Sequence, residues 1–339
     1  MNSKLINELP ELVKNQVISE ADATRIQDYY QSKQIDTPSK LFTVFGVLGS
    51  LLVGLGVILI LAHNWDDFPR TIKTILAFSP LVLGQVLVGY SIIKNKSPTW
   101  KEASGTFLFF AVGSSIGLVS QIYNIPGDLS SYILTWILLC IPLLYILKSN
   151  ALAILHIAFS TFYACNLGYG YTAMGASPWS YLVLMAALSP HYLHLLKRWP
   201  ESNITSIFNW LFPLSFTMTL GGFVGQHGNL GYVMYVILFG IFYNIGKILS
   251  INEQKLRRNG YLIFGSVGTV MLLLLASFNW LWEFRMTKEV LLSQEFYMTL
   301  CLFSLAMATL IYSYIKHWLK GINLFQYVFI IFTVLFFIG

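Results

Sequence analysis

Residues 41–62 read LFTVFGVLGSLLVGLGVILILA, an apolar run without a charged residue, and residues 63–70 read HNWDDFPR. A helix that crosses the hydrocarbon core of a bilayer needs about 20 consecutive apolar residues, so the first stretch has the length and composition of one membrane span. The second stretch gathers charged and aromatic residues and a proline, which is typical of the place where one helix leaves the membrane and the next begins. Together the two stretches predict a helical membrane protein.

The composition of the whole chain supports this interpretation. Of its 339 residues, 56% are hydrophobic and 11% are charged, whereas about a quarter of the residues of a soluble domain carry charge. Apolar runs recur to the end of the chain and predict about eleven spans, and alternating β-barrel segments of about ten residues are not seen. The expected span cores are 41–62, 71–93, 104–123, 130–147, 150–168, 178–196, 207–225, 230–249, 260–281, 296–315 and 322–339. We expect an all-α, polytopic transmembrane bundle over residues 39–339.

The placement of charge predicts the orientation of the bundle. With the N-terminus in the cytoplasm, most Lys and Arg residues of the loops fall on the cytoplasmic side, as the positive-inside rule requires. The basic residues left outside are Arg70, Lys73, Arg285 and Lys288, and the acidic residues outside are Asp66, Asp67, Asp128, Glu283, Glu289 and Glu295. The net charge of +6 then reflects topology and contact with anionic lipid headgroups, and it requires no nucleic-acid partner.

The two ends of the chain differ. Residues 1–38 are polar and charged, which is not the pattern of a cleavable signal peptide, and predict a cytoplasmic head of two short amphipathic helices. Ser19 has the properties of an N-cap, with Asp22 at the third helical position. So small a pair cannot bury a core alone, so it should dock on the bundle, on a second copy or on a partner protein. The chain ends within the apolar run 325–339, so either the last span ends at the outer surface or the sequence is part of a longer one.

Acidic residues follow two spans that leave the membrane on the same predicted side. Asp66 and Asp67 follow the first span and Asp128 follows the third, so these carboxylates could together bind a cation or the amine of a ligand. The alternative is that they cap helices while Trp65 lies in the interfacial aromatic belt. His156, in the middle of a span, is a functional candidate by default or a neutral histidine bonded to a neighbouring helix. The candidate ligand-binding residues are Asn64, Trp65, Asp66, Asp67, Gln121, Tyr123, Asp128 and His156.

No set of residues indicates catalysis or a bound metal. His191 and His194 share one helical face, but further ligands are not found nearby. The three cysteines lie in or beside apolar spans without paired spacing and are interpreted as small core residues. Because we find no nucleophile–base pair or HExxH motif, we predict no catalytic residue, metal or cofactor, and an enzyme is the least favoured class.

Small residues recur at helical spacing in two spans. Gly46, Ser50 and Gly54 in the first span, and Gly113 and Gly117 in the third, form faces that let helices approach closely. We expect both spans to be buried. One arrangement that would bury them is packing of the two spans against each other. FGVLG at 45–49 also resembles FGSVG at 264–268, a weak indication of an internal repeat.

Several stretches of the first half resemble one bacterial family. They are ELVKNQVISEADATRIQDYY at 11–30, AHNWDDFPR at 62–70, GLVSQIYNIPGD at 117–128 and ILTWILLCIPLL at 133–144. The sequence is similar here to the membrane proteins of domain-of-unknown-function family 2157. This resemblance implies an inner-membrane architecture and carries no assigned activity.

Three classes of function are compatible with these features. The many spans, their prolines, their small-residue faces and the outward acids favour binding or translocation of a small molecule or lipid. The polar head and the lack of an ionisable path through the membrane favour a non-catalytic scaffold or sensor that acts through a cytoplasmic partner or as a homo-oligomer. An intramembrane transferase that uses His156 or the outward aspartates is the third class. We favour the first.

Overall fold

The computed structural model describes residues 9–32, 65–170, 177–225, 227–247, 251, 255–283, 286–315 and 323–338. The chain divides into an N-terminal unit, Met1–Pro69, and a helical unit, Arg70–Gly339. The first expected span, 41–62, lies outside the described residues, and with it Gly46, Ser50, Gly54 and Asn64.

In the N-terminal unit, residues 9–14 and α2 (Glu20–Ser32) are helical. Ser19 precedes α2, where its Oγ accepts the N–H of Asp22 at 3.2 Å and donates to Asp22 Oδ2 at 2.5 Å. This exchange satisfies one of the free N–H groups at the start of the helix, as predicted for an N-cap.

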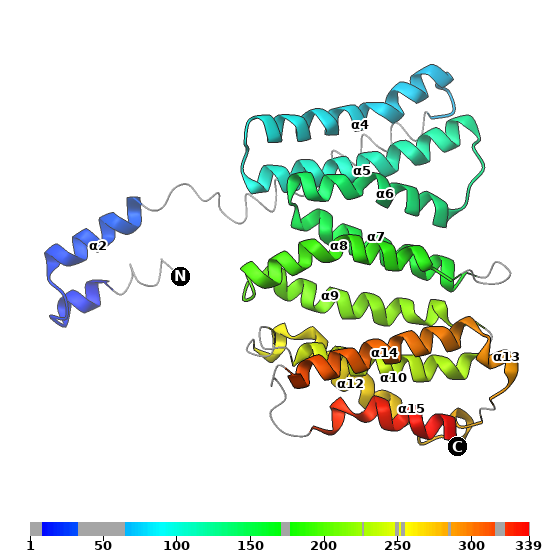
Figure 1. Cartoon of the computed structure of the whole chain (residues 1–339). Coiled ribbons are helices and arrows are strands. Elements are labelled where there is room, and N and C mark those ends of the chain that lie inside the picture. The colour runs from blue at the N-terminus through cyan, green and yellow to red at the C-terminus, as the bar shows by residue number, and fades with distance from the viewer. Residues whose placement is uncertain are drawn as a thin grey trace. The chain divides into compact units, whose positions relative to one another are not determined.

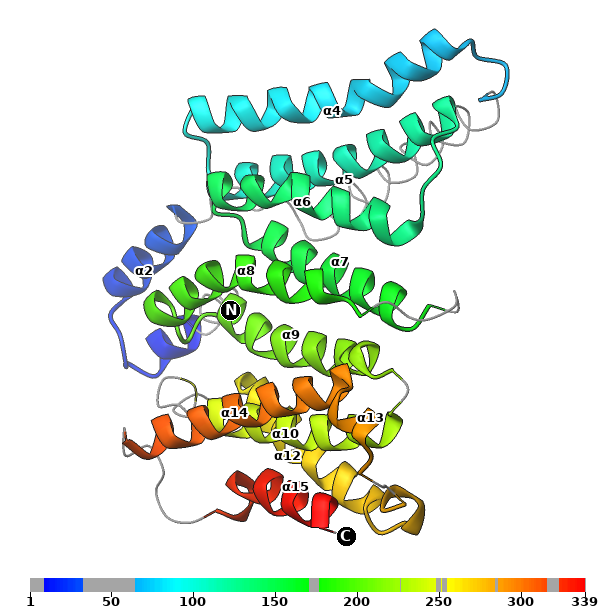
Figure 2. The same cartoon turned by 45° about the vertical axis from the view of Figure 1, so that its right-hand side comes forward.

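The helical unit is a stack of helices that alternate in direction, so that their connections gather at two opposite ends (Figures 1 and 2). Among the described residues it holds no strand, which confirms the all-α class. The longer helices are α4 (Arg70–Ile93), α5 (Pro98–Tyr123), α6 (Leu129–Leu147), α7 (Asn150–Gly168), α8 (Trp179–Arg198), α9 (Asn203–Leu220), α10 (Gly228–Gly246), α12 (Gly260–Leu275), α14 (Gln294–Ile315) and α15 (Val328–Ile338). The shorter ones are η1 (Gly221–Phe223), η2 (Leu256–Arg258), η3 (Asn279–Leu281), α13 (Lys288–Leu291) and η4 (Leu324–Gln326).

Six of the described helices are long and apolar enough to cross a membrane, namely α4, α5, α6, α7, α10 and α14. The count of about eleven spans is therefore not confirmed. The helices α12 and α15 are apolar but shorter than the expected spans 260–281 and 322–339. In the first case the chain turns after Leu275, and the indole Nε1 of Trp282 donates to the carbonyl of Ala276 at 2.8 Å, which closes the turn.

Local sequence explains where several helices begin. The side chains of Asp128, Ser149, Ser202 and Asn259 accept N–H groups in the first turns of α6, α7, α9 and α12. Such caps replace the intrahelical bonds that the first turn lacks. Proline lies inside α4, α6, α8 and α9 at positions 80, 142, 190 and 213.

Neighbouring helices pack along the stack, with α5 between α4 and α6, and α7 against α6, α8 and α9. The central helix of the C-terminal part is α10, which contacts α9, α12, α14 and α15. The contact between α10 and α12 depends on glycine. A Cβ atom on Gly265 would lie 2.6 Å from the backbone N of Tyr243, and one on Gly246 would lie 2.7 Å from the backbone N of Leu262. The two backbones therefore touch, as in small-residue membrane packing.

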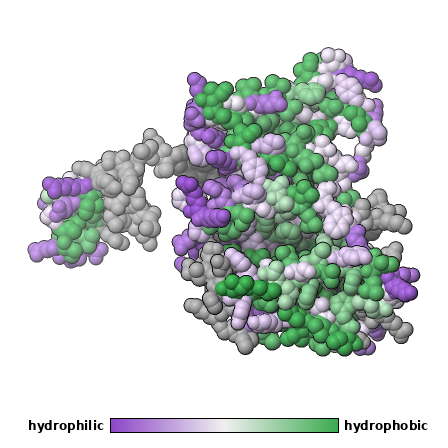
Figure 3. Space-filling view, viewed as in Figure 1, coloured by the Kyte–Doolittle hydropathy of each residue, from purple (hydrophilic) through white to green (hydrophobic). Residues whose placement is uncertain are grey.

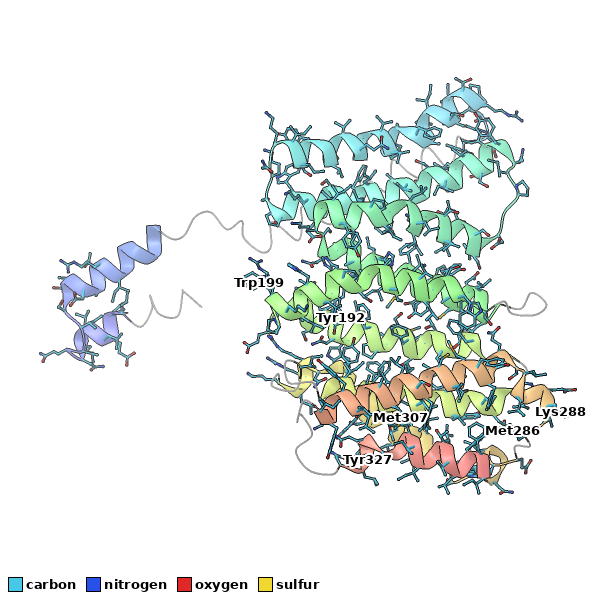
Figure 4. The ribbon with its side chains drawn as sticks, in the orientation of Figure 1. Tyr192, Trp199, Met286, Lys288, Met307 and Tyr327 are labelled. Atoms are coloured by element: carbon cyan, nitrogen blue, oxygen red, sulfur yellow. The ribbon has the colours of Figure 1, made fainter. Side chains whose placement is uncertain are left out.

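The two ends of the helical unit differ in charge. The connections α4–α5, α6–α7, α8–α9 and α10–α12 define the basic end, which carries Lys94, Lys96, Lys101, Lys148, Lys197, Arg198, Lys247, Lys255, Arg257 and Arg258. The opposite, acidic end carries Asp128, Glu283, Glu289 and Glu295 beside Arg70, Lys73 and Lys288. Figure 4 labels Trp199 at the basic end and Lys288 at the acidic end. Figure 3 shows an apolar middle with hydrophilic residues toward the ends, the pattern that a bilayer requires.

Candidate functional site: a groove between α4, α5 and α6

The α5–α6 connection places one carboxylate at the acidic end. Asn124 ends α5 in the left-handed conformation, with φ of 51°, and Asp128 caps α6. The N–H and Oγ–H of Ser131 donate to the two carboxylate oxygens of Asp128 at 2.9 and 2.7 Å. These hydrogen bonds from Ser131 lower the pKa of Asp128, so this exposed side chain is negatively charged at neutral pH.

Next to Asp128 lies a groove of about 930 Å³ between α4, α5 and α6. Most of its lining is apolar, and exposed side chains such as Phe78 and Leu139 show that it opens on the surface of the unit. The lining residues are Phe78, Leu81, Gln85, Val112, Ser115, Ile116, Gly117, Val119, Ser120, Ile125, Pro126, Gly127, Asp128, Leu129, Ser131, Tyr132, Thr135 and Leu139. From Leu129 to Leu139 the groove follows α6 for roughly 15 Å at the helical rise per residue.

Most polar groups in the groove already have backbone partners. Ser115 Oγ donates to the carbonyl of Ala77 at 2.8 Å, Tyr132 Oη donates to that of Gly113 at 2.9 Å, and Ser120 Oγ donates to that of Ile125 at 2.9 Å. Gln85 lies in the middle of α4. Its side chain is exposed and has no hydrogen-bond partner among the described residues. Among these groups, the amide of Gln85 can still donate and accept hydrogen bonds, and the carboxylate of Asp128 can still accept them from a ligand.

Aromatic rings pack where α5 and α6 meet. Trp136 packs against Phe109 and Phe159 with ring centroids 5.2 and 4.6 Å away, and its Nε1 donates to the carbonyl of Phe109 at 2.7 Å. A Cβ on Gly113 would lie 2.2 Å from this indole, so only glycine admits the ring. Gly113 and Gly117 thus both face α6, Gly117 with more room.

The candidate residues at the end of α5 and in the α5–α6 connection differ in their relation to the groove. Asp128 lines the groove, whereas Gln121 and Tyr123 are exposed at the end of α5 outside its lining, and Tyr123 Oη lies 3.1 Å from Thr74 Oγ1. Trp65, Asp66 and Asp67 form a turn in the N-terminal unit, so their joining Asp128 in one site stays a proposal.

Two histidines have partners on neighbouring helices. His156 is buried in α7, and its Nε2 lies 2.8 Å from the carbonyl of Leu184 on α8, which fits the alternative of a histidine bonded to a neighbouring helix. His191 Nε2 lies 3.1 Å from Asn150 Oδ1. Among the described residues no three His, Cys, Asp or Glu side chains gather as metal ligands would.

Two half-buried or buried carboxylates were not recognised as structural groups from the sequence. Glu102 on α5 accepts the N–H groups of Asn150 and Ala151 at 2.8 and 2.9 Å and the hydroxyl of Ser149, so it caps α7 from another helix. Glu295, 6% exposed, accepts the N–H of Gly225 at 2.9 Å. The N–H groups that Glu102 and Glu295 accept belong to residues dozens of positions away along the chain, so a local sequence motif could not predict either contact.

The fold defines a membrane protein of several apolar helices, and a groove lies between α4, α5 and α6. Residues 10–153 match the model of the family described as predicted membrane protein, DUF2157, which confirms the resemblance seen in the sequence. The matched region includes α2, α4, α5 and α6 and therefore all residues that line the groove. Neither the curated proteins nor the solved structures that were searched contain a match.

Proposed function

We propose that the protein binds a lipid-like amphiphile whose acyl chain lies in the groove and whose amine-bearing head contacts Asp128. The observation that carries this proposal is one apolar groove with a charged mouth. Its volume of about 930 Å³ is in the range of ligand sites, which are mostly apolar with a few placed polar groups. A groove roughly 15 Å long suits an extended acyl chain better than a compact polar metabolite.

The negative charge of Asp128 at the end of the groove favours a ligand with a positively charged headgroup. Asp128 is an exposed carboxylate whose oxygens accept from Ser131 but retain unused lone pairs. A primary amine, as in phosphatidylethanolamine, can donate to these oxygens, whereas an anionic head would be repelled. Binding in an inner membrane, with the acidic end outward, places this head in the outer leaflet. Translocation of the same ligand would be a further step of this function.

Native mass spectrometry of the full chain in micelles with added phosphatidylethanolamine tests the proposal. We expect Asp128→Asn to weaken retention about fivefold, the size of one exposed ion pair. Asparagine caps helices as well as aspartate, so the fold should be kept. Leu139→Trp, at a 60% exposed position of the lining, should block the groove and abolish retention.

The matched control is Glu283→Gln, which removes an exposed carboxylate from the acidic end outside the groove. This variant should retain the lipid as the wild type does. Wild-type retention in Leu139→Trp would contradict binding in the groove. An equal loss in Glu283→Gln and Asp128→Asn would show that only the overall charge of this end matters.

A further inference from the structure

A second groove lies between α9, α10 and α12 and differs from the first in chemistry. Its volume is about 570 Å³, and it is lined by Trp210, Thr217, Tyr232, Tyr235, Phe239, Ile263, Phe264, Val267, Gly268, Met271 and Leu272. The hydroxyls of Thr217 and Tyr235 donate to the carbonyls of Pro213 and Thr217 at 2.7 and 3.0 Å. Val267 and Met271 are exposed, so an apolar channel opens on the surface of the helical unit.

The basic end closes this groove. Trp210 donates from Nε1 to the carbonyl of Arg257 at 3.0 Å, and its ring meets Phe264 edge-on with centroids 5.9 Å apart. The backbone of η2 therefore lies beside Trp210, which lines this groove. Gly260 allows this approach, because a Cβ there would lie 2.4 Å from the carbonyl oxygen of Asn209.

Two exposed cations at this end of the groove have no carboxylate partner among the described residues. Arg258 is engaged, since Nη2 donates to Asn203 Oδ1 at 2.8 Å and Nη1 donates to the carbonyl of Glu201. Lys255 and Arg257, by contrast, are exposed and contact no carboxylate among the described residues. Their long side chains can extend from the rim of an apolar groove into the headgroup layer.

We propose that this groove binds one anionic phospholipid of the surrounding bilayer, with an acyl chain between α9, α10 and α12 and its phosphate on Lys255 and Arg257. Basic clusters beside membrane helices attract anionic headgroups, and each cation near the surface contributes to the attraction. The site is independent of the proposed function. It lies at the opposite end of the helical unit and selects a head of the opposite charge.

The test compares phosphatidylglycerol with phosphatidylethanolamine, added in equal amounts to the full chain in micelles and measured by native mass spectrometry. We expect the double variant Lys255→Gln, Arg257→Gln to bind phosphatidylglycerol about thirtyfold more weakly, the effect of two surface cations. Binding of phosphatidylethanolamine should not change. Val267→Trp should block the groove and remove phosphatidylglycerol even though both cations remain.

The matched control is Lys94→Gln with Lys148→Gln, which removes two exposed cations from other connections of the same end. It should bind phosphatidylglycerol as the wild type does. If the control weakens phosphatidylglycerol binding as much as the double variant does, general charge attraction explains the binding and the proposed site is wrong. Wild-type binding in Val267→Trp would show that the lipid does not bind in the groove. Wild-type retention of phosphatidylethanolamine in Asp128→Asn would contradict the proposed function but leave this site unaffected, so the two proposals fail separately.

Discussion

Replacing Gly265 by alanine is expected to lower the free energy of unfolding by about 3 kcal/mol, at the upper end of the usual cost of overpacking. The added Cβ would lie 2.6 Å from the backbone N of Tyr243 and 2.9 Å from the carbonyl oxygen of Phe239. Both atoms belong to the backbone of α10, which cannot move aside as a side chain can. The two helices must separate, and α10 would lose contact with α12 along its length. Unfolding in mixed micelles with a denaturing detergent, followed by tryptophan fluorescence, measures the change.

Gly89 provides the matched control for this prediction. It lies inside α4, and a Cβ there would meet no atom of the described residues within 4 Å. Gly89→Ala should leave stability unchanged or raise it by up to about 1 kcal/mol, because alanine favours the helix. If Gly265→Ala and Gly89→Ala unfold at the same denaturant concentration, the backbones of α10 and α12 do not touch at Gly265.

Replacing Glu102 by alanine is expected to lower the free energy of unfolding by about 2 kcal/mol, the typical range for hydrogen bonds to a charged group. The carboxylate accepts the N–H groups of Asn150 and Ala151 and the hydroxyl of Ser149, and it also complements the positive N-terminal end of α7. Its loss leaves the first turn of α7 without these acceptors. The same unfolding experiment measures the effect.

Two further variants separate this cap from a general effect of charge. Glu201 is an exposed carboxylate of the same end whose side chain makes no hydrogen bond among the described residues, so Glu201→Ala should change stability by less than about 0.5 kcal/mol. Glu102→Gln keeps one acceptor oxygen and should fall between wild type and Glu102→Ala. If Glu201→Ala lowers the free energy of unfolding as much as Glu102→Ala does, Glu102 does not act as a cap of α7.

Several parts of the fold could be predicted because they depend on neighbours in the sequence. The expected span 71–93 corresponds closely to α4 (Arg70–Ile93), since a helix needs only its own apolar residues to be stable in lipid. The cap formed by Ser19 on the N–H of Asp22 spans three residues and was predicted from residue type and spacing. The short helix α12 shows the limit, because an apolar run does not reveal the turn that Trp282 closes.

The sequence by itself determined the class of protein, the positions of most helices and the contrast in charge between their connections, because hydropathy, capping and charge act within one or two turns. The tertiary structure decided which small residues pack, as Gly265 against α10, and which carboxylate caps a distant helix, as Glu102 on α7. It also decided that Asp128 meets an apolar groove and that Arg257 closes another. These features depend on backbones and side chains that lie far apart in the chain and meet only when helices pack.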